Sequence, residues 1–157
     1  MPVIRLQTYI NASAEIVFDL SRSIDLHKIS TVHTNEQAVA GKTSGLINIG
    51  ESVTWKARHL GFTQILTSKI TAFEAPNYFI DEMVSGAFKS FKHEHIFNVK
   101  NDMTIMTDVF DYTSPYSFLG KIADVLFLKQ YMANLILKRN AVIKEFAENP
   151  MKYKSLL

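Results

Sequence analysis

The architecture of this chain is decided by residues 3–20, which read VIRLQTYINASAEIVFDL. Residues 3–10 are rich in β-branched and aromatic side chains and predict a strand. Ser13 supplies a hydroxyl suited to a helix N-cap, and Glu15 puts a negative charge in the first turn, where the helix dipole favours it. Apolar residues then recur at helical spacing, so a short helix over residues 14–20 follows the first strand directly.

Turn signals divide the middle of the chain into further elements. A second short helix is expected over residues 24–29. Six more strands are expected at residues 36–40, 51–59, 62–73, 78–84, 87–99 and 103–112. Glycine, proline and asparagine mark the turns between them. The short links permit only antiparallel neighbours, because a parallel crossover needs about a dozen residues or more.

The chain closes with one long amphipathic helix, expected over residues 116–147. Its apolar side chains recur at helical spacing and include Leu128, Met132, Leu135, Val142 and Phe146. Asn149 and Pro150 end the helix, and residues 150–157 are expected to form a frayed tail. A sheet between two helical ends predicts a single α+β domain over residues 1–149, with the last helix packed on the sheet.

Composition excludes several classes of protein. Apolar residues make up 47% of the 157 residues and charged residues 20%, as in a globular domain rather than a disordered chain. The net charge of +2, without a Lys/Arg run, excludes a nucleic-acid binder. Lys138, Arg139 and Lys144 share the last helix with acidic residues, and we interpret them as a solvated face. The longest apolar run, residues 125–128, is too short to span a membrane.

The chain contains no cysteine, which excludes disulfides, cysteine-based zinc sites and thiol nucleophiles. This composition, together with a first segment that lacks a leader pattern, is typical of a cytoplasmic protein. The sequence holds neither a phosphate-binding glycine loop nor a serine-nucleophile motif. We therefore expect no cofactor.

Alternation along the strands predicts which side chains face the interior. In residues 51–59 the odd-numbered positions form the buried face and include Trp55 and His59. In residues 91–99 the odd-numbered positions again point inward. They carry Phe91, His93, His95 and Phe97. The alternation breaks upstream at Lys89, which predicts a β-bulge there.

Two strands stay ambiguous by pattern alone. In residues 103–112, one face carries Met106, Asp108 and Phe110, and the other is equally apolar. In residues 78–84, the pattern slightly favours burial of Ile80 and its neighbours over the face that carries Asp81.

Several segments together resemble a known superfamily. They are residues 11–18 (NASAEIVF), 50–59 (GESVTWKARH), 86–88 (GAF), 93–97 (HEHIF) and 104–108 (TIMTD), followed by Pro115 and Leu119-Gly120. The chain is similar in these segments to the START / polyketide-cyclase / pollen-allergen superfamily, also called SRPBCC, and to a bacterial branch of ligand-binding proteins within it. The resemblance covers nearly the whole chain.

The resemblance implies a helix-grip fold, in which a curved seven-stranded antiparallel sheet surrounds the long C-terminal helix and two short helices follow strand 1. It also implies a cavity between sheet and helix. In that arrangement Thr104, Met106 and Asp108 face the cavity, and Asp81 does so as well, against the pattern.

These observations define a candidate ligand-binding site. Its residues are Trp55, His59, Phe91, His93, His95, Phe97, Met106, Asp108, Phe110, Leu128, Met132 and Leu135. The polar members have several interpretations: hydrogen-bonded core residues, a polar anchor for a ligand, a metal site, or a general base. If chemistry occurs, His93, His95 and Asp108 are the candidate catalytic residues. No metal is assigned to the site.

Three functions fit the sequence. The first is binding of a small hydrophobic molecule, such as a lipid, a polyketide or an aromatic metabolite. The second is a cyclase, dehydratase or hydrolase that uses the same polar groups. The third is a protein-interaction module resembling the chaperone activators of the superfamily. A homodimer is also possible, with residues 125–128 facing the cavity on one side and a second subunit on the other.

Overall fold

The computed structural model describes residues 2–115 and 117–157. Its strands are β1 (Val3–Ile10), β2 (Gln37–Gly41), β3 (Ser52–His59), β4 (Phe62–Glu74), β5 (Tyr78–Ser85), β6 (Ser90–Lys100) and β7 (Met103–Thr113). Its helices are α1 (Ala14–Ser21), α2 (Ile24–Ser30), η1 (Val32–Thr34), α3 (Ser117–Ala123), η2 (Asp124–Leu128), α4 (Lys129–Ala147) and α5 (Pro150–Tyr153).

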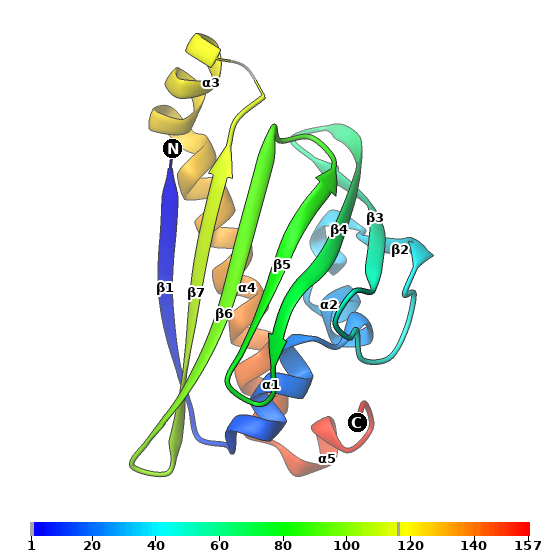
Figure 1. The fold of residues 1–157 in the computed structure, drawn as a ribbon, viewed down its shortest axis with the longest axis vertical. Coiled ribbons are helices and arrows are strands. Elements are labelled where there is room, and N and C mark those ends of the chain that lie inside the picture. The colour runs from blue at the N-terminus through cyan, green and yellow to red at the C-terminus, as the bar shows by residue number, and fades with distance from the viewer. Residues whose placement is uncertain (1, 116) are drawn as a thin grey trace.

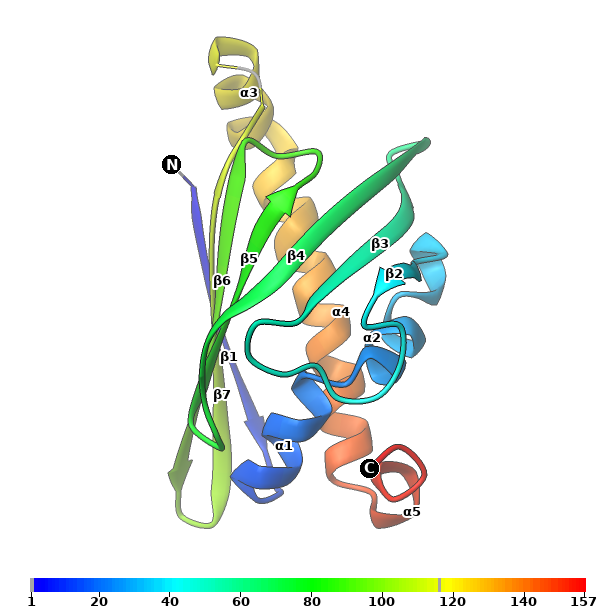
Figure 2. The same ribbon diagram turned by 45° about the vertical axis from the view of Figure 1, so that its right-hand side comes forward.

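The seven strands form one antiparallel sheet in the order β1-β7-β6-β5-β4-β3-β2. Figures 1 and 2 show the sheet curving around α4, which runs along one face of it. The helices α1 and α2 contact α4 near one end of the sheet. The predicted α+β helix-grip architecture is therefore confirmed.

Both short helices begin at the predicted serine caps. The Ser13 hydroxyl accepts a hydrogen bond from the Ile16 amide, and the Ser23 hydroxyl accepts one from the Leu26 amide. These bonds satisfy amide groups that a helix start leaves unpaired. The buried face of α1 then presents Phe18 to the sheet. Its ring makes edge-on contacts with Phe73, Phe79 and Phe97 at centroid distances of 5.2, 5.5 and 5.4 Å.

The last helical region consists of α3, η2 and α4 rather than one continuous α-helix, and its predicted start at residue 116 lies outside the described residues. The tail also differs from the prediction. The Asn149 side chain caps α5 by accepting from the Met151 amide, and Tyr153 and Leu156 pack against the core. Burial of these two apolar side chains explains why the tail is helical rather than frayed.

Two strand details bear on the predicted pattern. β6 begins at Ser90, which pairs with Thr113, and the Lys89 amide donates to the Thr113 carbonyl at 2.9 Å. Residues 89 and 90 therefore both lie opposite Thr113, as the predicted bulge requires. In β5, Phe79 and Asp81 line the cavity described below, as the resemblance implied and against the pattern. Alternation did not identify the cavity face of β5, because Ile80, on the opposite face of the sheet, is also buried. Within the described residues, no helix is both long enough and apolar enough to cross a membrane.

Candidate functional site: a cavity between the sheet and α4

A cavity of about 590 Å³ lies between the sheet and α4. Its volume is within the range of small-molecule sites, roughly 300–1,000 Å³. Strands β3 to β7 and the helices α2 and α4 supply its walls. The apolar wall includes Trp55, Phe79, Phe91, Phe110, Leu135 and Ile136. Such a wall favours an apolar molecule, because burying apolar surface gains about 25 cal/mol per Å².

Nine of the twelve predicted site residues line this cavity: Trp55, His59, Phe91, His93, His95, Phe110, Leu128, Met132 and Leu135. The other three lie elsewhere. Phe97 and Met106 belong to the buried core, because α1 covers that end of the sheet. Asp108 is fully buried behind the two β6 histidines and does not reach the cavity. Alternation placed Phe97 on the inward face, and the family resemblance placed Met106 and Asp108 there. Neither of them indicates where α1 covers that face.

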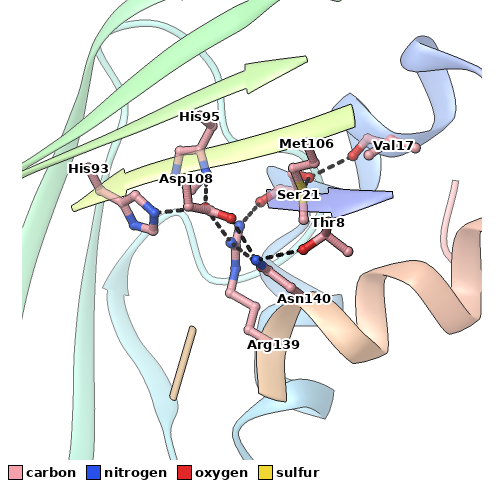
Figure 3. Close-up of polar contacts among 9 residues, drawn as sticks. All are labelled: Thr8, Val17, Ser21, His93, His95, Met106, Asp108, Arg139 and Asn140. Carbon is pink, nitrogen blue, oxygen red and sulfur yellow. Dashed lines mark hydrogen bonds and ion pairs between the residues drawn. The ribbon is translucent and has the colours of Figure 1, made fainter. Parts of the chain in front are cut away.

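Asp108 is the centre of a buried hydrogen-bond network (Figure 3). His93 Nε2 lies 2.8 Å from Asp108 Oδ1, and Asn140 Nδ2 donates to Oδ2 at 2.6 Å. His95 Nδ1 lies 3.1 Å from Oδ1. Burial alone would raise the pKa of Asp108, but hydrogen bonds from His93 and His95 outweigh burial and hold this pKa well below its usual range. Asp108 is therefore ionised and accepts, so His93 must donate from Nε2.

Arg139 completes the network from α4. Its Nη1 lies 3.6 Å from Asp108 Oδ1, and its Nη2 donates to the Ser21 carbonyl at 2.8 Å. The prediction of a solvated basic face is therefore wrong for Arg139, although Lys138 is exposed. One signal could have found this: Arg139 follows Ile136 by three residues and precedes Ile143 by four, and both isoleucines are buried.

His95 is packed between aromatic rings in the wall of the cavity. Its ring is buried and stacks on Phe79 at 4.2 Å and against His93 at 3.9 Å between centroids. Burial, and then the charge of His93, lower the pKa of His95 well below its usual value. The imidazole is therefore neutral and packs as an aromatic ring.

The predicted metal alternative does not fit this arrangement. His93, His95 and Asp108 do bring ligand atoms within 4.8 Å of one another. However, the Arg139 guanidinium lies 3.6 Å from the same carboxylate oxygen, and Asn140 donates to the other. A divalent cation would have to displace these donors and lie beside a fixed positive charge, which opposes its binding.

His59 does not converge on Asp108 but belongs to a second polar group on the cavity wall. Its Nδ1 is 2.9 Å from the Tyr131 hydroxyl of α4. Nearby, His27 Nε2 lies 2.8 Å from Glu36 Oε1, and the His27 ring packs on Trp55 at 4.2 Å. Burial opposes ionisation of Glu36, but the charge and hydrogen bond of His27 lower its pKa. Sequence reasoning missed His27, Glu36 and Tyr131, since no spacing connects these three positions.

Asp81 is the remaining carboxyl group on the wall. It pairs directly across the sheet with His93, and its Oδ1 is enclosed without a hydrogen-bond partner. Burial raises the pKa of Asp81, although Ser68 and the charge of His93 act in the opposite direction. The wall therefore holds one carboxyl group whose pKa is raised by burial and whose Oδ1 has no hydrogen-bond partner.

Comparison with known proteins identifies the fold. No protein-family model matches the sequence, and no curated protein matches it. Solved structures do match. A protein from Thermus thermophilus, TTHA0849, superposes with a TM-score of 0.75 at 16% identity, over 92% of this chain and 95% of its own. The chain has the helix-grip fold.

Two further structures extend this comparison. Major latex-like protein 151 from Panax ginseng matches with a TM-score of 0.68 at 17% identity, covering 94% of this chain and 98% of that one. StfQ, the di-domain ARO/CYC of the steffimycin biosynthetic pathway, matches with a TM-score of 0.75 at 10% identity, over 93% of this chain and 50% of StfQ. The superfamily predicted from the sequence segments is thus the one whose fold this chain shares.

Proposed function

We propose that this chain binds one small hydrophobic molecule, such as a lipid, a polyketide or an aromatic metabolite, in the cavity between the sheet and α4. The observation that carries the proposal is the cavity itself, whose wall is largely apolar and aromatic while its few polar groups gather around His93 and His59. Ligand sites typically combine apolar walls with a small number of placed polar groups. The absence of cysteine suits a cytoplasmic location.

A titration with a fluorescent apolar probe tests this proposal. Ala57 is buried on the cavity wall, and Arg58, the next residue of β3, is exposed on the other face. Ala57→Phe should fill part of the cavity and weaken binding at least tenfold, whereas Arg58→Phe should leave binding unchanged. Equal binding by both variants would show that the probe occupies the surface instead.

The second candidate is a cyclase, dehydratase or hydrolase reaction inside the same cavity. One observation favours it: His93 lies on the wall with Nε2 hydrogen-bonded to the buried, ionised Asp108. A histidine held this way leaves its second nitrogen available as a general base. Our predicted catalytic role for His95 has less support, since its ring is packed between Phe79 and His93. Loss of turnover in a folded His93→Gln protein would support catalysis.

The interaction-module hypothesis receives less support. A protein-interaction module would have an interior filled by side chains, whereas this structure contains a cavity of about 590 Å³. A pull-down that captures the same partner with wild-type protein and with the cavity-filling Ala57→Phe variant would favour this third hypothesis.

A further inference from the structure

Besides its histidines, the cavity wall carries two positively charged side chains, Arg139 and Arg22. Both already donate to acceptors within the protein. Arg139 donates to the Ser21 carbonyl and lies beside the Asp108 carboxylate. Arg22 is 2.7 Å from Asp19 Oδ1 and donates to Asn48 Oδ1, also at 2.7 Å. A ligand carboxylate would have to compete with these partners for either guanidinium.

Carboxyl groups also surround this end of the cavity. Glu36 is on the wall and is ionised beside His27, and Asp108 lies directly behind His93 and His95. Each of these carboxylates is already paired with a basic side chain. A ligand anion placed here would therefore lose its hydration without meeting an unpaired positive charge, which makes its entry unfavourable.

Asp81 offers the opposite kind of contact. It lies on the wall opposite His93 in the β5–β6 pairing, and one of its oxygens is enclosed without a partner. An ionised carboxylate enclosed in this way carries a large desolvation cost, and protonation removes that cost. Burial raises the pKa of Asp81 in the same sense. A neutral carboxyl group has an O–H to donate and needs an acceptor.

We infer that the molecule bound in this cavity carries an uncharged hydrogen-bond acceptor, such as a ketone, ester or amide carbonyl, which Asp81 recognises, and that ligands ending in a carboxylate are disfavoured. The inference rests on the proposed binding function and narrows its ligand class. It separates carbonyl compounds from free fatty acids and aromatic acids, which the apolar walls alone would accept equally well.

Three naphthalenes of nearly the same size test it: 2-acetylnaphthalene, 2-isopropenylnaphthalene and 2-naphthoate. Competition against a fluorescent apolar probe at pH 7.5 gives their relative affinities. The ketone should bind roughly five- to tenfold more tightly than its isopropenyl isostere, as expected for one added hydrogen bond. The naphthoate should bind most weakly. Tighter binding of naphthoate than of the ketone would overturn the inference.

Variants at residue 81 test whether Asp81 causes the preference for the ketone. Asp81→Asn keeps an uncharged donor and should preserve the preference for the ketone. Asp81→Leu removes the donor and should bring the ketone to the affinity of the isopropenyl compound. The control Glu82→Gln changes the next residue of β5, whose side chain points to the other face, and should alter nothing. Asp81→Asn binding the ketone far more tightly than wild type would show an ionised Asp81 and contradict the inference.

The same experiment separates the two proposals. If the ketone and the isopropenyl compound bind equally in wild type, the cavity function stands and the recognition by Asp81 fails. If none of the three compounds competes with the probe, the cavity function fails and the inference fails with it.

Discussion

Arg139 Nη1 lies 3.6 Å from Asp108 Oδ1, although one residue belongs to α4 and the other to β7; the Arg139 side chain is 11% exposed and that of Asp108 is fully buried. Asn140, next along α4, donates to the other oxygen of the same carboxylate. Two consecutive helix residues thus hold one strand residue. This contact fixes how far α4 is displaced along the sheet and therefore the shape of the cavity between them.

Removing the charge of Asp108 should destabilise the fold strongly. In Asp108→Asn, the buried Arg139 loses its counter-charge, and breaking a buried pair in this way typically costs about 3–5 kcal/mol of unfolding free energy. Urea unfolding measures this cost. The matched control is Asp111→Asn, on the other face of the same strand, which should change stability by less than about 0.5 kcal/mol. Similar small effects for both variants would contradict the central role of Asp108.

Stability should fall as the pH drops below about 6.5 because His95 is buried in its neutral form. Its pKa is lowered from the ordinary value of 6.5, so between that value and the folded pKa the unfolded chain binds a proton that the folded protein does not. The stability contributed by neutral His95 is present above pH 6.5 and is lost as the pH falls. His59, whose pKa is also lowered by burial, acts in the same direction.

Urea midpoints measured from pH 8 to pH 5 test this dependence. His95→Phe keeps the aromatic stack on Phe79 and should reduce the pH slope by up to about 1.4 kcal/mol per pH unit, the value for one proton. The control His33→Gln changes an exposed histidine and should alter the slope much less than His95→Phe does. An unchanged slope in His95→Phe would mean that His95 is protonated in the folded protein.

The bond between His59 and Tyr131 connects the end of β3 with α4 across the cavity wall. Tyr131→Phe removes this bond while keeping the ring. We expect ligand dissociation to accelerate about fivefold, because one hydrogen bond worth about 1 kcal/mol no longer holds the two sides together. Stopped-flow displacement of the fluorescent probe measures the rate. Tyr9→Phe, on an exposed residue away from the cavity, is the control, and equal rates in both variants would refute this role.

The homodimer expected from the sequence stays a prediction. Val125 and Leu126 are 86% and 74% exposed in η2, beside the cavity-lining Leu128. Large exposed apolar side chains in one segment are typical of interaction surfaces. Leu126→Glu should weaken self-association at least tenfold in sedimentation equilibrium. A wild-type chain that is monomeric at every concentration would exclude the dimer.

The sequence predicted the sheet and both short helices because their signals are local. Alternation set the inward face of β3 and β6, and Ser13 and Ser23 capped α1 and α2 as hydroxyl residues at a helix start do. These signals depend on neighbouring residues alone. Tertiary packing did not override them.

What the sequence could not predict depends on contacts between distant segments. Alternation left the face of Met106 and Asp108 open, and the family resemblance placed them correctly. Only the packing of α1 decides that Met106 lies in the core, where the Ser21 hydroxyl is 3.3 Å from its sulfur. Likewise, Arg139 looked like a surface residue because its counter-charge, Asp108, is 31 positions away in the sequence. The partner of His59, Tyr131, is 72 positions away and shows no motif.

The tail was predictable in hindsight from a local signal. Asn149 followed by Pro150 is a favourable N-cap and first helical position, and it begins α5. The same two residues also end the preceding helix, which is the role that the pattern predicts for them. They perform both roles, since α4 ends at Ala147.

The most direct test of the account is an NMR measurement of where an apolar ligand lies. With isoleucine methyl groups labelled, 2-acetylnaphthalene should give intermolecular NOEs to Ile70 of β4 and Ile136 of α4, which line the cavity from opposite sides, and none to the core residues Ile10 and Ile143. NOEs to both Ile70 and Ile136 are the predicted result. Saturable binding that gives NOEs to neither of them would place the ligand outside the cavity and contradict the account.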